Sequence, residues 1–131
     1  MAKRRSTKKR RILLVDDEVS ITRALAVYLE ENGDCDVRVE NQGSRALATA
    51  REFRPDLIFL DIMMPDADGS ALAAEMKTDP VLRTIPIVFL TALVSQHEAR
   101  GGTMRIGGHP FLAKPVDPDT VLEYIDKHAL Q

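Results

Sequence analysis

The sequence predicts an α/β fold: a doubly wound parallel sheet of five strands with helices on both faces. Two observations support this prediction. Short apolar runs recur along the chain, and segments with helical periodicity lie between them. Regular alternation of strand and helix implies right-handed crossovers and one parallel sheet. With 131 residues, 44% of them hydrophobic and 29% charged, the chain has the size and composition of one globular domain.

Five segments are predicted strands. Residues 12–15, 57–60 and 87–90 are uninterrupted apolar runs, which is the pattern of strands buried on both faces of a sheet. Residues 36–40 alternate between polar and apolar side chains and therefore predict a half-exposed strand. The fifth segment, residues 110–115, is short and bounded by prolines.

Two helices are predicted between the first three strands. Residues 20–31 carry apolar side chains at three- and four-residue spacing, and Gly33 supplies a stop signal after them. Residues 44–54 show the same spacing, with alanine, leucine and phenylalanine on one face. Each of these segments can cover the sheet with one apolar stripe.

The later helices are signalled by their caps. Asp68 can cap a helix that continues past residue 76, and Asp117 can cap the last helix, with Pro118 in its first turn. Gly101 and Gly102 interrupt residues 95–110, and each costs about 1 kcal/mol relative to alanine inside a helix. We expect a short or mobile helix in that segment.

The charge is distributed unevenly. Seven of the 18 Lys and Arg residues lie in the first 11 positions, so the net charge of -2 hides an acidic body. We expect residues 1–10 to be a basic disordered tail, because like charges repel and the segment lacks apolar residues. The alternative is a weak contact with nucleic acid or an acidic protein, but no aromatic residue or basic helix reinforces it.

Other features narrow the class of protein. The longest apolar runs are far shorter than the roughly 20 residues that cross a membrane, and no apolar signal segment follows the basic start, so we expect a cytoplasmic protein. Cys35 is the only cysteine and cannot form an internal disulfide. His97, His109 and His128 show no metal-ligand spacing and are expected at the surface.

Polar side chains follow four of the predicted strands, at the point where each strand ends. Ligands of an open parallel sheet bind beyond the carboxyl ends of its strands, so these side chains are expected to meet. Each one alone could be a helix cap, a turn residue or a solvated charge. The set consists of Asp16, Asp17 and Glu18 after the first strand, Asp61 after the third, Thr91 after the fourth and Lys114 after the fifth.

The chemistry of this set suits phosphoryl transfer. Converging carboxylates raise one another's pKa unless a cation joins them, and hard oxygen ligands favour Mg²⁺. Lys114 can neutralise a phosphoryl oxygen, and the Thr91 hydroxyl can donate a hydrogen bond to another. A carboxylate can be the nucleophile, and Asp61, central in the set, is the expected acceptor.

These motifs resemble those of the receiver (CheY-like) domain of two-component response regulators. The resemblance rests on DD at residues 16–17, LDIMMPDADG from residue 60, TA at residues 91–92 and KP at residues 114–115, and it covers residues 11–131. It implies a flavodoxin-like (βα)5 fold with sheet order 2-1-3-4-5. It also implies a phosphorylated protein that catalyses only its own aspartyl phosphorylation and dephosphorylation.

The resemblance also implies roles for individual residues. Asp61 would accept a phosphoryl group from a histidine kinase or phosphotransfer protein. Asp17, Asp61 and the backbone carbonyl of Met63 would bind Mg²⁺, with Asp16 acting mainly through water. Lys114, which is expected to precede a cis proline bond, would pair with Asp61 or its phosphate.

Thr91 and Phe111 would form the switch. Thr91 would move toward the phosphoryl group and Phe111 would turn inward, although Phe111 could equally be a simple core residue. The phosphorylated state would then act on a downstream protein target or form a homodimer. Unusual glycines and Pro110 before the fifth strand leave open whether the face that commonly serves as the partner surface keeps that role.

Two alternatives come from other classes. A haloacid-dehalogenase-like phosphatase would need a second acid two residues after Asp61, where this chain has Met63, and is set aside. A receiver-shaped adaptor that works without phosphorylation fits the fold but leaves the four strand-end motifs without a purpose. The sequence leaves open whether the chain acts alone or is one receiver of a longer protein.

Overall fold

The computed structural model describes residues 9–92 and 105–130, and its centre is a five-stranded parallel sheet. The strand order is β2-β1-β3-β6-β7, which confirms the predicted doubly wound topology. The strands are β1 (Arg10–Val15), β2 (Cys35–Glu40), β3 (Leu57–Asp61), β6 (Ile87–Thr91) and β7 (Phe111–Ala113). Among the described residues, no helix is long and apolar enough to cross a membrane.

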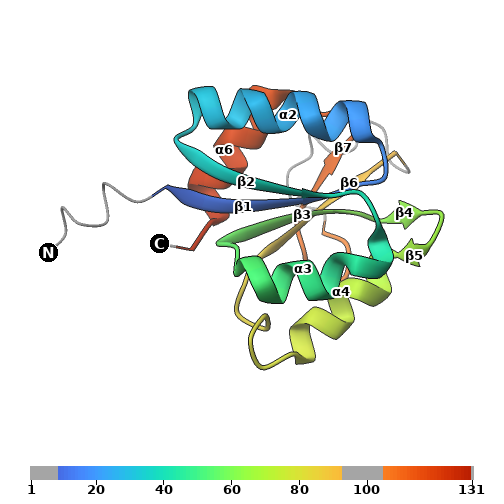
Figure 1. Cartoon of the computed structure of the whole chain (residues 1–131). Helices are drawn as coiled ribbons and strands as arrows, with labels where there is room; N and C mark the ends of the chain where they lie inside the picture. The colour runs from blue at the N-terminus through green and yellow to red at the C-terminus, as the bar shows by residue number, and fades with distance from the viewer. Residues whose placement is uncertain (1–8, 93–104, 131) are drawn as a thin grey trace, which may run out of the picture.

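Helices cover both faces of the sheet (Figure 1). On one face lie α2 (Val19–Asn32) and α6 (Pro118–His128). On the other lie α3 (Ala46–Phe53), which a short 3-10 helix η1 (Gly43–Arg45) precedes, and α4 (Gly69–Thr78). The four predicted helices in the described ranges are therefore present.

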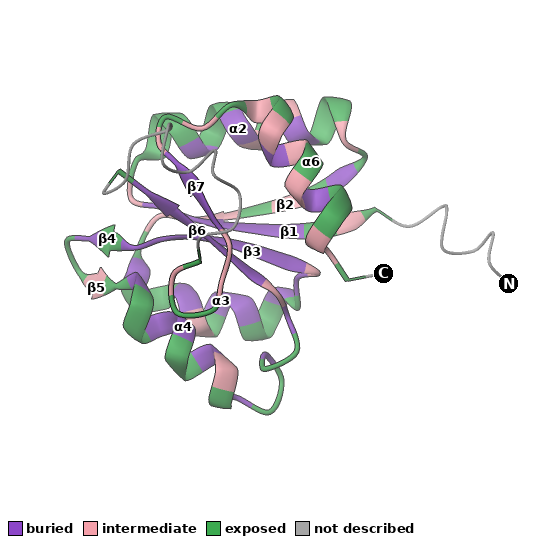
Figure 2. Cartoon of the chain, turned by 180° about the vertical axis from the view of Figure 1, so that it is seen from behind, coloured by how far each residue is buried: buried purple, intermediate pink, exposed green. Residues whose placement is uncertain are grey.

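Two apolar cores follow from the alternation of side chains along the strands. In β1, Leu13 and Val15 pack toward α3 and α4, whereas Ile12 and Leu14 pack toward α2 and α6. All four of these side chains are fully buried, and Figure 2 shows the same burial across the central strands. Burial on both faces explains why the central strands read as continuous apolar runs.

Three helix ends agree with the sequence. The Asp68 side chain accepts a hydrogen bond from the Ser70 N–H, and Asp117 accepts one from the Asp119 N–H, so both predicted N-caps are confirmed. Helix α2 ends before Gly33 as expected, and the Gly33 N–H donates to the Leu29 carbonyl at 2.8 Å. The next residue, Asp34, has a left-handed backbone conformation with φ 53.

Two local structures were not expected from the sequence. A short hairpin of β4 (Met63–Met64) and β5 (Ala67–Asp68) follows β3. Before β7, Ile106 and His109 form an antiparallel bridge around Gly107 and Gly108, both with positive φ. The predicted short helix of residues 95–110 lies mostly outside the described residues, and residues 105–110 form this turn. Residues 1–8 of the predicted tail also lie outside them.

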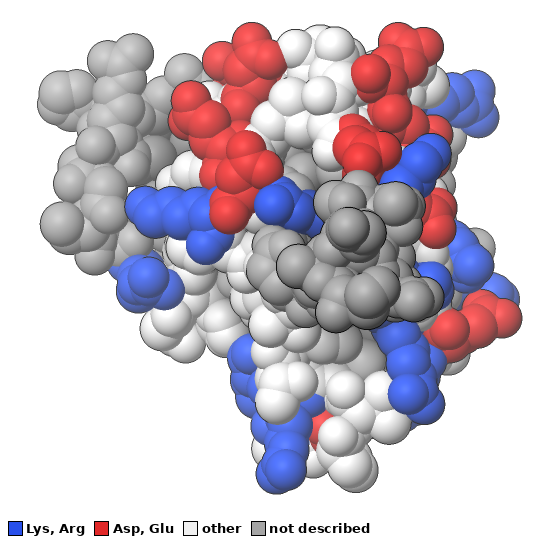
Figure 3. Space-filling view, turned by 90° about the vertical axis from the view of Figure 1, so that its left-hand side faces the viewer, with Lys and Arg blue, Asp and Glu red and all other residues white. Residues whose placement is uncertain are grey.

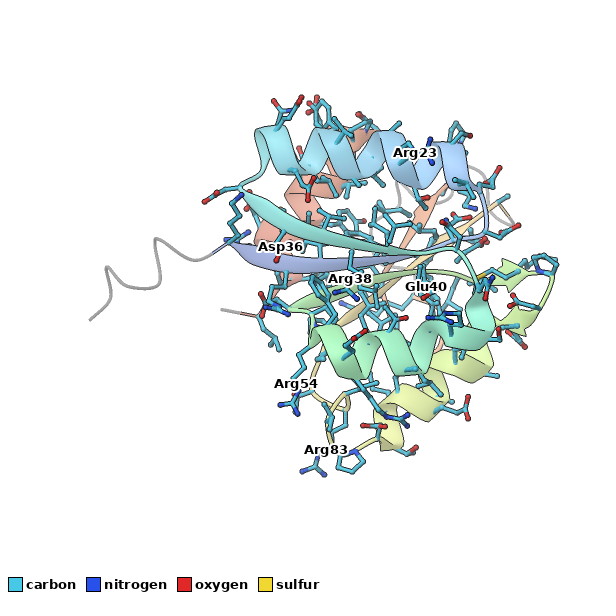
Figure 4. The ribbon with its side chains drawn as sticks, in the orientation of Figure 1. Arg23, Asp36, Arg38, Glu40, Arg54 and Arg83 are labelled. Atoms are coloured by element: carbon cyan, nitrogen blue, oxygen red, sulfur yellow. The ribbon has the colours of Figure 1, made fainter. Side chains whose placement is uncertain are left out.

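Charged side chains protect the edge strand β2 (Figure 4). Asp36, Arg38 and Glu40 alternate along it with two half-buried valines, as the predicted half-exposed strand requires. Arg38 stacks on the ring of Phe53 at 5.0 Å, and the Glu40 carboxylate accepts a hydrogen bond from the Thr49 hydroxyl. Charged residues on an edge strand oppose pairing with another chain.

The amino ends of the strands carry charges of both signs, with acidic groups gathered over the α2 and α6 half (Figure 3). The Arg10 guanidinium pairs with Asp126 of α6 at 2.6 Å. The Arg11 guanidinium donates to the Phe53 carbonyl and stacks over the Phe53 ring, while the Arg11 N–H donates to Asp56. These contacts lie at the amino ends of the strands, at the edge of the sheet opposite Asp61 and Lys114.

Gly69, the first residue of α4, lies unusually close to the end of β3. A Cβ added there would lie 2.2 Å from the Asp61 carbonyl oxygen and 2.7 Å from the Ile62 Cα, both backbone atoms. The Gly69 N–H donates to the Ile62 carbonyl at 2.7 Å, which fixes this approach. The backbone cannot yield as a flexible side chain could.

We predict that Gly69→Ala destabilises the protein by about 2 kcal/mol, measured by urea unfolding. Helix propensity alone would stabilise the variant by up to about 1 kcal/mol, so the sign of the change tests the close approach. The neighbouring Ser70→Ala, on an exposed position of the same helix, is the control and should change little. Equal or greater stability of Gly69→Ala would contradict the prediction.

Candidate functional site

The strand-end residues meet at the carboxyl edge of the sheet, beside the β4–β5 hairpin (Figure 1). Asp61 and Thr91 are the last residues of β3 and β6, and Asp16 and Lys114 directly follow β1 and β7. The parallel register brings these ends level, and the Lys114 N–H donates to the Thr91 carbonyl at 2.8 Å. The topology thus assembles residues that are far apart in the sequence.

Three carboxylates form a cluster at this edge. Asp16, Asp17 and Asp61 each offer an oxygen, and these oxygens lie within 4.8 Å of one another. Asp16 is 1% exposed and Asp61 is 4% exposed, so water screens their repulsion poorly. Such a set of hard oxygen ligands is suited to a divalent cation.

Backbone and side-chain groups hold the two buried carboxylates in place. The Glu18 N–H donates to Asp16 Oδ1 at 3.1 Å, and the Met63 N–H donates to Asp61 Oδ1 at 3.2 Å. The Asn41 side chain donates to the backbone carbonyl of Asp16 at 2.7 Å. One oxygen of each carboxylate is therefore fixed by its own loop, while the other faces Lys114.

The Lys114 ammonium lies among three carboxylates. Its Nζ is 2.7 Å from Asp16 Oδ2, 3.1 Å from Glu18 Oε1 and 3.2 Å from Asp61 Oδ2. Burial alone would lower the pKa of Lys114, but hydrogen bonding and attraction from these carboxylates outweigh it and raise the pKa. Lys114 therefore stays charged and offsets part of the negative charge of the cluster.

The surroundings of Asp61 disfavour its ionisation. Burial raises the pKa of Asp61 to about 6, and repulsion from Asp16 adds to the rise. Attraction and a hydrogen bond from Lys114, together with the Met63 N–H, oppose it. Near neutral pH the Asp61 carboxylate is present but held at a cost in free energy, which a cation or a covalent bond would relieve.

The remaining predicted residues lie around this centre. Thr91 is buried beside Asp61, and the Met63 side chain is 65% exposed at the rim. Phe111 is 5% exposed and packs in the core on the α3 and α4 side, opposite Phe89 in the register. The expected cis bond between Lys114 and Pro115 is present.

Two contacts of the site were not visible in the sequence. Glu18 was expected only as one of the polar residues after β1, and its partner Lys114 lies 96 residues away. Asp66 of the β4–β5 turn accepts hydrogen bonds from the N–H groups of Gly43 and Ser44, at the start of η1. Both donors to Asp66 are backbone N–H groups, and no pattern of side chains in the sequence identifies them as its partners.

Cys35, His109 and His128 are not among the residues that form the site. Cys35 is buried on the α2 and α6 side, where burial raises the pKa of its thiol to about 11. His109 and His128 are half-buried rather than at the open surface, and the ring of His109 meets Phe89 edge to face at 5.4 Å. His97 lies outside the described residues.

Comparison with known proteins gives consistent matches. The family model of the response regulator receiver domain matches residues 12–126. Response regulator Rre1 of Synechocystis sp. is 34% identical over 119 residues, which are 91% of this chain and 51% of that protein. Protein PilH of Pseudomonas aeruginosa is 33% identical over 116 residues, which are 88% of this chain and 94% of PilH. The chain thus spans about half the length of Rre1 and nearly all of PilH.

Solved structures agree with the sequence matches. Chemotaxis protein CheY4 of Vibrio cholerae has a TM-score of 0.77 and 28% identity, covering 92% of this chain and 99% of that one. The BeF3-activated receiver domain of Klebsiella pneumoniae RstA has a TM-score of 0.75 and 31% identity, covering 93% and 100%. With the family model matching most of its length, the chain belongs to the response regulator receiver domains of two-component systems.

Proposed function

We propose that this chain accepts a phosphoryl group on Asp61 from a histidine kinase or a histidine phosphotransfer protein. The observation that carries the proposal is the placement of Asp61. Its Oδ2 is 3.2 Å from the ammonium of Lys114, and its carboxylate lies within the cluster formed with Asp16 and Asp17. An anion is otherwise repelled by three carboxylates, so the cluster needs positive charge before a phosphoryl group can enter.

The residues present fit Mg²⁺. Asp17 and Asp61 would bind the ion directly, Asp16 would act mainly through water, and the Met63 carbonyl would complete the protein ligands. The grouping of three oxygens and the raised pKa of Asp61 support this assignment. When bound, Mg²⁺ supplies positive charge that offsets the developing charge on the phosphoryl oxygens.

The transfer itself needs little covalent chemistry from the protein. An Asp61 oxygen attacks phosphorus, the bond from phosphorus to the donor's imidazole nitrogen breaks, and the nitrogen takes the electron pair. Lys114 stabilises charge on one phosphoryl oxygen and the Thr91 hydroxyl donates a hydrogen bond to another. The chain is its own substrate, so it catalyses only its own phosphorylation and dephosphorylation.

A groove beside the site offers room for the donor. Its volume is about 780 Å³, and it lies between α2 and the segment that joins β7 to α6. Ile21, Ala24 and Tyr28 of α2 line one side, with Pro115 and Val116 opposite. The mostly apolar lining suits a helix of the donor protein that carries its phosphohistidine toward Asp61.

Phosphorylation would switch the protein through Thr91 and Phe111. Thr91 is the last residue of β6 and lies next to Asp61. Phe111 lies on the neighbouring strand β7, where it pairs with Phe89 of β6. The phosphoryl dianion on Asp61 would draw Thr91 toward it and change the packing around Phe111. Thr91 and Phe111 together would be the two-state element. A downstream protein target or a second copy of the chain would bind the changed conformation.

The relatives that are longer than this chain differ from it in the length outside the matched receiver domain. The relative named DNA-binding response regulator MtrA of Mycobacterium tuberculosis matches this chain over 47% of its length. Nucleic acid is proposed as a partner of this chain at most weakly, through the basic segment of residues 1–10. A phosphorylation-independent adaptor remains the competing function, and the first experiment below separates the two.

We predict that acetyl phosphate with Mg²⁺ adds one phosphoryl group to the chain, measured by intact mass. Asp61→Asn should abolish the added mass because the amide is not a nucleophile at that position. Asp36→Asn, an exposed carboxylate on β2, is the matched control and should be modified like the wild type. An unmodified wild-type chain under these conditions would favour the adaptor.

We predict that the stability of the metal-free protein depends on the ionisation of Asp61. Its pKa of about 6 in the folded state exceeds the value of about 3.9 in an unfolded chain, so folding favours its protonated form. The stability contribution is therefore most favourable below pH 4 and falls as pH rises through 6. Asp61→Asn should be more stable than the wild type by about 1–2 kcal/mol at pH 8, with no such gain at pH 4.

Urea unfolding in EDTA at both pH values measures this difference, with Glu31→Gln on the exposed side of α2 as the control for net charge. Added Mg²⁺ should stabilise the wild type at pH 8 more than Asp61→Asn, because the ion loses a ligand in the variant. Equal stabilisation of both proteins by Mg²⁺ would remove Asp61 from the proposed metal site.

A further inference from the structure

The Lys114 ammonium is shared among three carboxylates in this structure. An ammonium carries three N–H groups, and Asp16, Glu18 and Asp61 each lie within 3.2 Å of its nitrogen. A phosphoryl oxygen on Asp61 that is stabilised by Lys114 competes with these carboxylates for the ammonium. Burial decides which of the contacts to Asp16 and Glu18 is exchanged at the lower cost.

Glu18 is the partner that can leave at low cost. Its side chain is 49% exposed, whereas the side chains of Asp16 and Asp61 are 1% and 5% exposed. A carboxylate oxygen that loses its partner in the interior has no water to replace it, whereas a carboxylate at the surface is hydrated. Asp16 also belongs to the carboxylate cluster, whereas Glu18 lies outside it.

The location of the ion pair adds to this argument. Glu18 and Lys114 both line the groove beside the site, and the Glu18 side chain is the more exposed of the two, so a phosphoryl donor that enters there comes close to its carboxylate. Glu18 also occupies the N-cap position of α2, yet its side chain makes no capping hydrogen bond. The side chain therefore contributes to the lysine and not to the helix end.

We propose that Glu18 is a positioning residue that holds Lys114 in the unphosphorylated state and competes with the incoming phosphoryl group for it. The proposal rests on the proposed phosphorylation of Asp61. In the unphosphorylated protein Glu18 keeps the ammonium at the mouth of the site; on phosphoryl transfer its contact is exchanged for one to a phosphoryl oxygen. Glu18 thereby lowers the rate of phosphorylation and weakens the hold of the site on the phosphoryl group.

Two substitutions test the ion pair separately from the charge. Glu18→Gln removes the charge and the strong contact. Glu18→Asp keeps the charge, but its shorter side chain is a favoured N-cap that bonds to the α2 backbone and does not reach Lys114. Glu31→Gln, on the same helix with an exposed side chain, repeats the charge change far from the lysine.

The first measurement is the rate of phosphorylation by acetyl phosphate in saturating Mg²⁺. Both Glu18 variants should react about two- to fivefold faster than the wild type, the size expected for one exposed ion pair, while Glu31→Gln should not change. The second measurement is the affinity for beryllofluoride, a phosphoryl mimic, which should tighten by a similar factor in both variants. A purely structural role of Glu18 in capping α2 would not tighten it.

The outcomes are separable. Unchanged or slower reaction of both variants overturns the proposal, because Glu18 then does not restrain Lys114. Acceleration in Glu18→Gln alone also overturns it, since net charge at the groove and not the ion pair is then responsible. A wild-type chain that gains no phosphoryl group refutes the proposed function itself, whereas phosphorylation with indistinguishable variants refutes only the role of Glu18.

Discussion

The site depends on one interaction: a single ammonium placed among carboxylates that the fold has removed from water. Lys114 approaches Asp16 and Asp61 at 2.7 and 3.2 Å, and both carboxylates are nearly inaccessible. Without that positive charge the carboxyl ends of β1 and β3 would carry buried like charges in a poorly screening environment. Buried carboxylates are tolerated at this edge of the sheet because Lys114, directly after β7, lies at the same edge.

Much of this arrangement is readable from the sequence, for a definite physical reason. Strands buried on both faces must be continuously apolar, so the runs that contain Leu14, Phe59 and Val88 stand out, and the polar residue that ends each run marks the edge of the sheet. Asp68 and Asp117 announce helix starts because their hydrogen bonds are local. Strands and helix caps, which depend on residues close together in the sequence, can therefore be predicted from the sequence.

The features that escaped prediction are those set by distant partners. The left-handed conformation of Asp34, directly after the end of α2, has no signal in the residues around it. The β4–β5 hairpin is tied by Asp66 to the start of η1, and Gly43 lies so near that an added Cβ would be 2.6 Å from the Ala67 Cβ. The role of Glu18 depends on its contact with Lys114, which is distant in the sequence and is brought close by the fold.

The contact between Gly69 and the end of β3 makes the join of strand and helix mechanically stiff. The backbone of α4 begins against the carbonyl of Asp61, and the Gly69 N–H is bonded to Ile62, so no slack segment lies between them. Asp61 and the first turn of α4 are therefore joined through backbone contacts alone, with no side chain between them that could absorb a change in either.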